Sequence, residues 1–265
     1  MRRNHKIKNF FYTFFIASIV GFITLFFVKE LRKDRSIQWT TTPKQQITTG
    51  NQKIRNFRAA KKLANRFYQK NHFKTFYCGC DFNRGRIERK SCSYTPVNSR
   101  DPRSRRLEWE HVVPISYLGH NISAWKNGHP RCLKKNGKKY KGRRCARLVS
   151  KEFNKMEADL YNLVPSVGEV NKLRANFPIG LVEKNQSYAF NCETKIKPGK
   201  IEPRDEVKGF LARIYLYMDK AYPGNNLINN RNRSLIETWN KQFPPTPHEK
   251  ARNAYIKQVQ GNTFS

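Results

Sequence analysis

Six cysteines constrain how this chain of 265 residues can fold. They are Cys78, Cys80, Cys92, Cys132, Cys145 and Cys192. All of them follow a long apolar run near the N-terminus, and an even number of cysteines in an exported chain indicates up to three disulfides. Many pairings are possible, and the sequence alone does not choose among them.

A loop rich in glycine, lysine and arginine favours one pairing. We expect Cys132–Cys145 because this disulfide closes the loop of residues 127–147. The pairs Cys80–Cys92 and Cys78–Cys192 then remain. A zinc site is the alternative use of these thiols, but the spacing of Cys78 and Cys80 differs from the two-residue spacing of common zinc knuckles.

The apolar run covers residues 9–28, which contain no acid or base and have about the length of a membrane span. Residues 1–8 are basic, which predicts that they stay in the cytoplasm. The run ends without the small-x-small site of a cleaved signal peptide, which favours a signal anchor in the inner membrane over a signal peptide. Either segment would export the rest of the chain to the periplasm or the outside. The polar residues 29–52 are predicted to be a tether.

The chain is strongly basic, with a formal net charge of +34 from 53 basic and 19 acidic residues. Such a charge attracts polyanions and speeds their encounter with the protein, so nucleic acid is the leading expected partner. A highly soluble surface, or attraction to anionic lipid, is the alternative explanation. An aromatic content of 13% is not that of a disordered basic tail.

Residues 53–265 are predicted to form one domain of the α+β class, rich in helices. Apolar residues at helical spacing predict helices over residues 53–72, 159–173, 207–222, 233–243 and 248–260. Short strands are expected over residues 76–82 and 107–113. A turn around Asn83 to Gly85 follows the first strand, and residues 127–147 are predicted to be a loop.

Two short stretches carry groups suited to phosphodiester hydrolysis, namely Glu108–Pro114 and Asp159–Pro165. His111 is a credible general base because an imidazole titrates near neutral pH. Glu110 and Asn162 offer oxygen ligands for Mg²⁺, which needs few protein ligands. Glu110 and His111 would point to opposite faces of a regular strand, so a bulge or a strand end near Pro114 is required. Taken singly, each residue is more often an ordinary surface group or, for Asn162, a helix cap.

Read together with their flanking residues, these stretches resemble the bacterial endonuclease I family. The resemblance runs from about residue 55 to the C-terminus, and its further motifs are Tyr77–Cys80, Gly168–Asn171, Arg213–Met218 and Gln260–Asn262. It implies a ββα-metal active site in a periplasmic or secreted nonspecific nuclease.

By this resemblance, His111 is the general base, and Glu110 and Asn162 hold a single Mg²⁺, for which Mn²⁺ or Ca²⁺ can substitute. The family also places an arginine against the phosphate, a short way after the Glu-His pair. We expect Arg131 in this role, with Arg147 and Arg174 as alternatives.

The sequence therefore predicts an exported, Mg²⁺-dependent, nonspecific endonuclease that acts as a monomer. By the family resemblance, it cleaves double- and single-stranded DNA, and RNA, to products with 5′-phosphates. We see no base-reading module, so contacts are expected mainly at phosphates. The alternative is an exported DNA-capture protein without catalytic activity, which would share the charge but would not need Glu110, His111 and Asn162.

Overall fold

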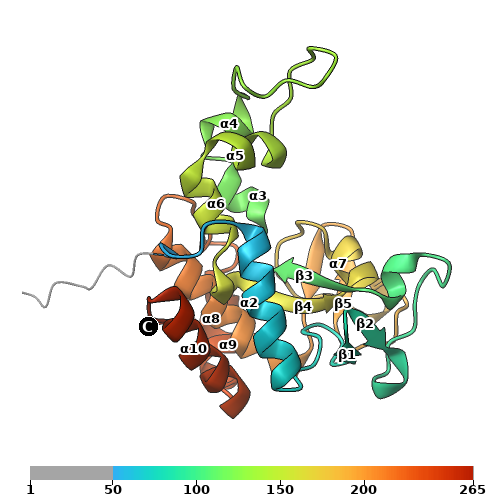
Figure 1. Ribbon diagram of the computed structural model, residues 1–265. Helices are drawn as coiled ribbons and strands as arrows, with labels where there is room; N and C mark the ends of the chain where they lie inside the picture. The colour runs from blue at the N-terminus through green and yellow to red at the C-terminus, as the bar shows by residue number, and fades with distance from the viewer. Residues whose placement is uncertain (1–49, 265) are drawn as a thin grey trace, which may run out of the picture. The chain divides into compact units, whose positions relative to one another are not determined.

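Figure 1 shows the computed structural model, which describes residues 50–264 of the chain. The predicted basic segment 1–8, the apolar run 9–28 and nearly all of the predicted tether lie outside these residues. Within residues 50–264, no helix has the length and hydrophobicity that a bilayer crossing requires. Gly50 and Asn51 are already buried, so the packed part of the chain begins before residue 53.

The described residues form an α+β domain of helices and short antiparallel strands, as the sequence predicted. The helices are α2 (Phe57–Lys70), α3 (Ile115–Gly119), α4 (Ser123–Lys126), α5 (Arg143–Val149), α6 (Lys151–Glu157), α7 (Gly168–Arg174), α8 (Asp205–Ala221), α9 (Arg233–Gln242) and α10 (Pro247–Gln260). The strands are β1 (Asp81–Asn83), β2 (Arg86–Glu88), β3 (Leu107–His111), β4 (Leu163–Val167), β5 (Lys195–Lys197) and β6 (Lys200–Glu202). They pair in sequence order as β1–β2, β3–β4 and β5–β6.

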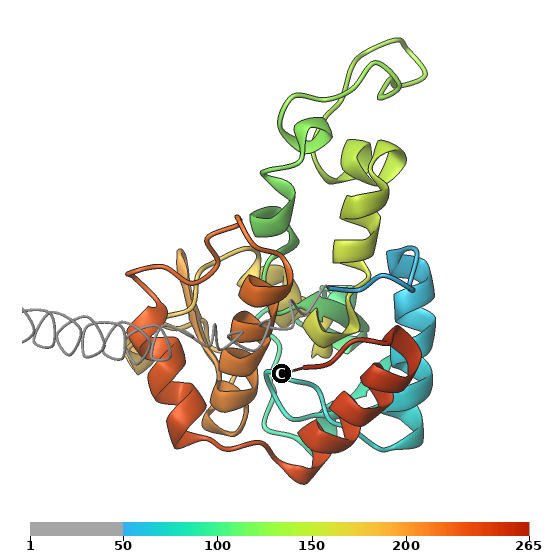
Figure 2. The ribbon, with the colours of Figure 1, turned by 90° about the vertical axis from the view of Figure 1, so that its left-hand side faces the viewer.

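The long predicted helices are confirmed, and their end residues explain where they begin. Asn56 caps α2 by accepting a hydrogen bond from the amide of Ala59, and Thr246 caps α10 in the same way. Asp205 and Glu206 lie in the first turn of α8, where their negative charges interact favourably with the positive end of the helix dipole. Figure 2 shows α2 and α10 side by side, and the ring of Phe67 stacks on that of Tyr255 with 4.5 Å between centroids.

The unit β3–β4–α7 lies at the centre of the domain. Strand β3 is antiparallel to β4, with Glu110 opposite Val164 and His111 opposite Leu163. Every residue of β4 is buried, and α7 follows directly at Gly168. The two strands and the helix thus bring residues about 60 positions apart in the chain to one place.

The prediction of one helix over residues 159–173 is wrong. A short 3-10 turn (Leu160–Asn162) leads into strand β4, and only Gly168–Arg174 is helical. Pro165 accounts for the difference, since it lacks the amide hydrogen that a helix interior needs but fits a strand that pairs on one side. Its carbonyl accepts a hydrogen bond from the amide of Phe76 at 2.8 Å.

Two other predicted segments are confirmed only in part. The strand expected over residues 76–82 is limited to its end, because a tight turn holds the preceding residues: Gly79 has a φ of +65° and its amide bonds to the carbonyl of Thr75. The turn at Asn83 to Gly85 is present and joins β1 to β2. The loop 127–147 is correct until Arg143, where α5 begins.

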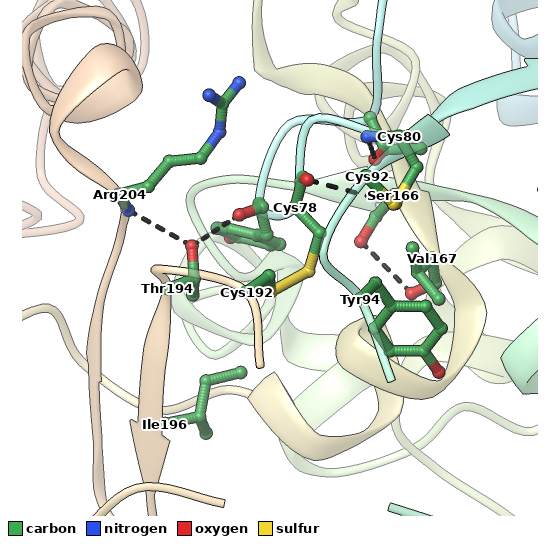
Figure 3. Close-up of a disulfide and its surroundings, with 12 residues drawn as sticks. Cys78, Cys80, Cys92, Tyr94, Ser166, Val167, Cys192, Thr194, Ile196 and Arg204 are labelled. Carbon is green, nitrogen blue, oxygen red and sulfur yellow. Dashed lines mark hydrogen bonds between the residues drawn. A yellow bond between two sulfur atoms is a disulfide. The ribbon is translucent and has the colours of Figure 1, made fainter. Parts of the chain in front are cut away.

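The six cysteines form three disulfides, Cys78–Cys192, Cys80–Cys92 and Cys132–Cys145. This is the pairing expected from the sequence. Figure 3 shows the first of them beside Thr194, whose hydroxyl donates to the carbonyl of Tyr77 and accepts from the amide of Arg204. The disulfide and this hydroxyl together fix the backbone around Tyr77.

Asp159 is a buried acceptor that ties distant segments together. The hydroxyls of Tyr217 and Tyr222 both donate to its Oδ2 at 2.7 Å. The side-chain amide of Gln260 donates to Oδ1 at 2.9 Å, and the backbone amide of Asn51 donates to Oδ2 at 3.2 Å. One carboxylate thereby joins the start of the domain, helix α8 and the end of α10.

We predict that Asp159→Ala lowers the free energy of unfolding by about 3 kcal/mol or more, because it leaves several buried donors without an acceptor. Denaturant unfolding followed by circular dichroism measures this change. Asp205→Ala is the control, because Asp205 is exposed, and its ion pair with Lys208 and its place in the first turn of α8 are each worth about 1 kcal/mol or less. Equal losses in the two variants would contradict the prediction.

Candidate active site

A cavity of about 560 Å³ opens where strand β3 ends, beside the second half of helix α7. Its walls come from several elements: α2, β3, α3, the base of α4, α5 and α7. The residues around it are Phe57, Arg103, Glu108, Trp109, Glu110, His111, Pro114, Ile115, Ser116, Trp125, Arg143, Asn171, Arg174, Ala175 and Asn176. The predicted pair Glu110 and His111 therefore lies in one cavity, and β3 ends at His111 as that arrangement requires.

His111 is 6% exposed and is held in one orientation. Its Nε2 lies 2.9 Å from the backbone carbonyl of Glu157. Since a carbonyl only accepts, Nε2 must carry the hydrogen, and a neutral ring then has a lone pair on Nδ1. Burial and the nearby charge of Arg143 lower the pKa of His111 to about 4, which keeps the ring neutral at pH 7. The ring of Phe57 packs against the imidazole, with 5.0 Å between centroids.

Glu110 is a buried carboxylate with one of its oxygens in use. The hydroxyl of Tyr77 donates to Oε1 at 3.1 Å, and Arg174 Nε lies 3.0 Å from the same oxygen. Burial raises the pKa of Glu110 to about 7, against the opposing effect of the Arg174 charge. Within residues 50–264, no hydrogen bond reaches Oε2, so this oxygen can coordinate a cation.

Asn162 does not reach the cavity. It is fully buried, its Oδ1 accepts from the amide of Val113 at 2.7 Å, and its Nδ2 donates to the carbonyl of the same residue at 2.9 Å. Both ends of the amide are thus used to hold the chain that follows β3. The side chain has a structural contact in place of the ligand position expected from the sequence.

Asn171 lies in the cavity instead. It is on α7, and its Nδ2 donates to Oε2 of Glu108 at 3.0 Å. This bond fixes the amide so that Oδ1 points away from Glu108, and no hydrogen bond to Oδ1 occurs in the described part of the chain. The signal was present in the motif Gly168–Asn171, but treating residues 159–173 as one helix hid the strand-to-helix junction that places Asn171.

The three arginines considered from the sequence occupy different places. Arg131 is exposed in a loop and is not among the cavity residues. Arg174 lines the cavity but is fully buried, and its Nη2 donates to the carbonyl of Val112 at 2.5 Å. Arg147 lies outside the cavity, and its Nε is 2.6 Å from the carboxylate of Glu157. The Nε of Arg143 lies 2.5 Å from the other oxygen of the same carboxylate.

Arg143 was missed by the sequence reasoning and lines the cavity. It is the first residue of α5, and its guanidinium lies 5.5 Å from the centroid of the Phe57 ring. About two fifths of its side chain is exposed, so it can meet a substrate while Glu157 holds it in place. The only sequence signal was that Arg143 lies two residues before Cys145. The disulfide between Cys145 and Cys132 fixes the backbone there.

The tautomer of His111 can be tested directly. We predict that ¹⁵N NMR of the histidine-labelled protein at pH 7 shows His111 with hydrogen on Nε2 and a bare Nδ1, because the carbonyl of Glu157 selects that form. The exposed His120 has no such bond and serves as the internal comparison. A spectrum with hydrogen on Nδ1 of His111, or a fully protonated ring, would refute the assignment.

Comparison with known proteins gives the family. Residues 49–264 match the sequence profile of the family Endonuclease I. An extracellular deoxyribonuclease from Aeromonas hydrophila is 38% identical over 217 residues, which cover 79% of this chain and 86% of that protein. A periplasmic deoxyribonuclease of the same organism is 37% identical, covering 80% and 85%. An Endonuclease-1 from Buchnera aphidicola is 35% identical, covering 79% of each chain. The chain therefore belongs to the endonuclease I family and is a nuclease.

Proposed function

We propose that this nuclease is exported and hydrolyses phosphodiester bonds of DNA and RNA with the help of one Mg²⁺ ion, leaving 5′-phosphates. One observation carries the proposal: the bare Nδ1 of His111 belongs to a cavity that also contains a carboxylate, an amide oxygen and a cationic arginine. A base, a place for a divalent cation and a phosphate contact are the groups that the reaction requires.

Glu110 and Asn171 are the residues that would hold the ion, which replaces the pair Glu110 and Asn162 expected from the sequence. Oε2 of Glu110 and Oδ1 of Asn171 are both oxygen donors without a protein partner in the described residues, and Mg²⁺ prefers oxygen and keeps several waters. Among the described residues, no three His, Cys, Asp or Glu side chains lie close enough together to bind a metal ion. A site with two protein ligands and several waters therefore suits this cavity better than a site made of protein ligands alone. When bound, the ion stabilises negative charge on the phosphate oxygens and on the leaving 3′ oxygen. Mn²⁺ and Ca²⁺ are the expected substitutes.

His111 performs the proton transfer. Its Nδ1 takes a proton from a water molecule, whose oxygen attacks the phosphorus as the bond to the 3′ oxygen breaks. The phosphate stays on the 5′ oxygen of the downstream nucleotide, and the leaving 3′ oxygen takes a proton from solvent water. The carbonyl of Glu157 keeps the ring oriented, and the ring of Phe57 limits its rotation.

Arg143 is the residue we assign to the phosphate, in place of Arg131. Its guanidinium can donate to a phosphate oxygen while Glu157 fixes its position, and such a fixed donor stabilises charge that develops in the transition state. Arg174 has a different task, because its bonds to the backbone and its proximity to Glu110 orient the carboxylate.

The substrate range follows from the chemical group that the cavity can bind. Its charged groups suit a phosphodiester, which DNA and RNA share, and the net charge of +34 favours the backbone of either polymer in single- or double-stranded form. Membership in a nuclease family favours this enzyme over the alternative of an inactive DNA-capture protein.

Export is supported by the three disulfides and by the relatives named as extracellular or periplasmic. We further propose that residues 9–28 remain as an anchor in the inner membrane. Cell fractionation with N-terminal sequencing of the mature protein should then find the initiating segment intact in the membrane fraction. A new N-terminus after residue 28 in a released protein would contradict the anchor but leave the catalytic proposal untouched.

The catalytic proposal predicts that the protein digests plasmid DNA with Mg²⁺ and stops when a chelator is added. His111→Ala should lower the rate by about 10²-fold or more, because it removes the imidazole whose bare Nδ1 accepts the proton of the attacking water. His120→Ala is the matched control, since His120 is exposed and outside the cavity, and it should stay within about threefold of the wild type. Near-native turnover of His111→Ala, or DNA binding without cleavage by the wild type, would overturn the proposal.

The two arginines make a second comparison. Arg143→Gln should lower kcat by about 10²-fold, the usual cost of removing one fixed donor to the developing charge. Arg131→Gln should leave kcat within about threefold. The melting temperatures of both variants are compared with that of the wild type. They show whether loss of the ion pair between Arg143 and Glu157 destabilises the fold. A larger loss for Arg131→Gln than for Arg143→Gln would restore the assignment made from sequence.

A further inference from the structure

A basic arm extends from the body of the domain beside the cavity. We use this name for residues 126–147, which run from the end of α4 into α5. Figures 1 and 2 both show this segment reaching beyond α3 and α6, with its tip distant from β3 and β4. Of the arm, only Arg143, where the arm joins the domain, is proposed to take part in catalysis. The tip lies outside the cavity.

The arm is built to hold its shape. The disulfide Cys132–Cys145 crosses it, and both sulfurs are buried in a small cluster with Ala124. At the tip, the amide of Lys134 bonds to the carbonyl of Lys138 at 2.9 Å, which closes a turn. Below the turn, the amide of Tyr140 bonds to the carbonyl of Cys132 at 2.9 Å. The backbone of the tip is thus held by a disulfide and by hydrogen bonds, so the positions from which its side chains extend are defined.

The charge of the arm is of one sign. Between Glu110 and Glu152 the sequence contains no acidic residue. The basic residues of the arm are Lys126, Arg131, Lys134, Lys135, Lys138, Lys139, Lys141, Arg143, Arg144 and Arg147. The four tip lysines at positions 134, 135, 138 and 139 are exposed, and none has an ion-pair partner among the described residues. This differs from Arg143 and Arg147 at the base, which both pair with Glu157.

The base of the arm is also part of the cavity wall. Arg143 of the arm lines the cavity, as does Trp125, the residue just before the arm, and the amide of Gly142 bonds to the carbonyl of Trp125 at 3.0 Å. The ring of Trp125 in turn lies 5.5 Å from that of Phe153 in the core. A polymer bound at Arg143 therefore lies at the base of an arm whose tip carries four lysines without ion pairs in the described residues.

We propose that the tip lysines of the basic arm bind backbone phosphates of the nucleic acid several nucleotides away from the bond that is cut. The arm would then act as a second anchoring site, which raises affinity for long substrates and adds nothing to the chemical step. This inference rests on the proposed function. A solvated surface of equal charge would lack both the fixed tip and the direct link to the cavity.

The test replaces Lys134, Lys135, Lys138 and Lys139 with glutamine in the full chain. The control variant makes the same change at Lys90, Lys241, Lys250 and Lys257, which are exposed and without ion pairs in the described residues but lie outside the arm. Binding of a duplex of about 30 base pairs is measured in chelator, so that no cleavage occurs, over a range of salt concentrations. Equal melting temperatures and intact disulfides establish that both variants fold.

We expect the arm variant to have a weaker salt dependence than the wild type. The magnitude of the negative slope of log affinity against log salt should decrease by about 0.9 for each tip lysine that contacts a phosphate, and by about 2 or more in total. The control should change it by less than about 1. With Mg²⁺ present, the arm variant should lose about tenfold or more in kcat/KM on the long duplex. It should stay within about twofold of the wild type on a tetranucleotide, which is too short to reach the tip.

Equal slopes in the arm and control variants would overturn the proposal, and so would an equal loss on long and short substrates. A further contrary result is loss of binding to anionic phosphatidylglycerol vesicles with DNA binding unchanged, which would assign the arm to a membrane surface. Failure of the proposed function looks different, because the wild type would then cleave neither substrate while the binding slopes still report on the arm.

Discussion

The hydrogen bond between His111 Nε2 and the carbonyl of Glu157 is the interaction on which the active site depends. It selects the ring form with a bare Nδ1 and fixes where that atom points. Glu157 ends helix α6, and Arg143 and Arg147 hold its carboxylate. The backbone that orients the base and the arginine assigned to the phosphate are therefore connected through one residue.

This arrangement relies on packing far from the cavity. Asp159 follows Glu157 by two positions, and its bonds to Tyr217, Tyr222 and Gln260 fix the backbone that leaves α6. The Cys78–Cys192 disulfide holds the segment that places the hydroxyl of Tyr77 against Glu110. The proposed catalytic geometry therefore depends on contacts spread over the whole domain, the Cys78–Cys192 disulfide among them.

Much of the fold could be predicted because its signals are local. Helices α2, α8, α9 and α10 have apolar faces of regular period and end at recognisable residues such as Gly261, whose φ is +85°. The cysteine pairing agreed with expectation because Cys132 and Cys145 flank one glycine- and lysine-rich loop, which the sequence marks clearly. Strand β4 was misread because it is buried at every position and so shows no alternation of apolar and polar residues, which left Pro165 as the one informative residue.

The site was harder to predict, because membership in it depends on tertiary contacts. Glu110 and His111 are adjacent in the chain, and their chemistry was readable. Asn162 and Asn171 are both asparagines near the same motif, and only the contact of Asn162 with Val113 removes it from consideration. Arg131 and Arg143 lie at the two ends of one disulfide-closed loop, where the sequence does not reveal which end meets the cavity.

The most direct test of this account is a crystal soaked in Mn²⁺ and measured for anomalous scattering. The account predicts a single strong peak in the cavity that contacts the carboxylate of Glu110 and the amide oxygen of Asn171, beside the Nδ1 of His111. A peak at Asn162, or an empty cavity at saturating Mn²⁺ with an oligonucleotide bound, would contradict it.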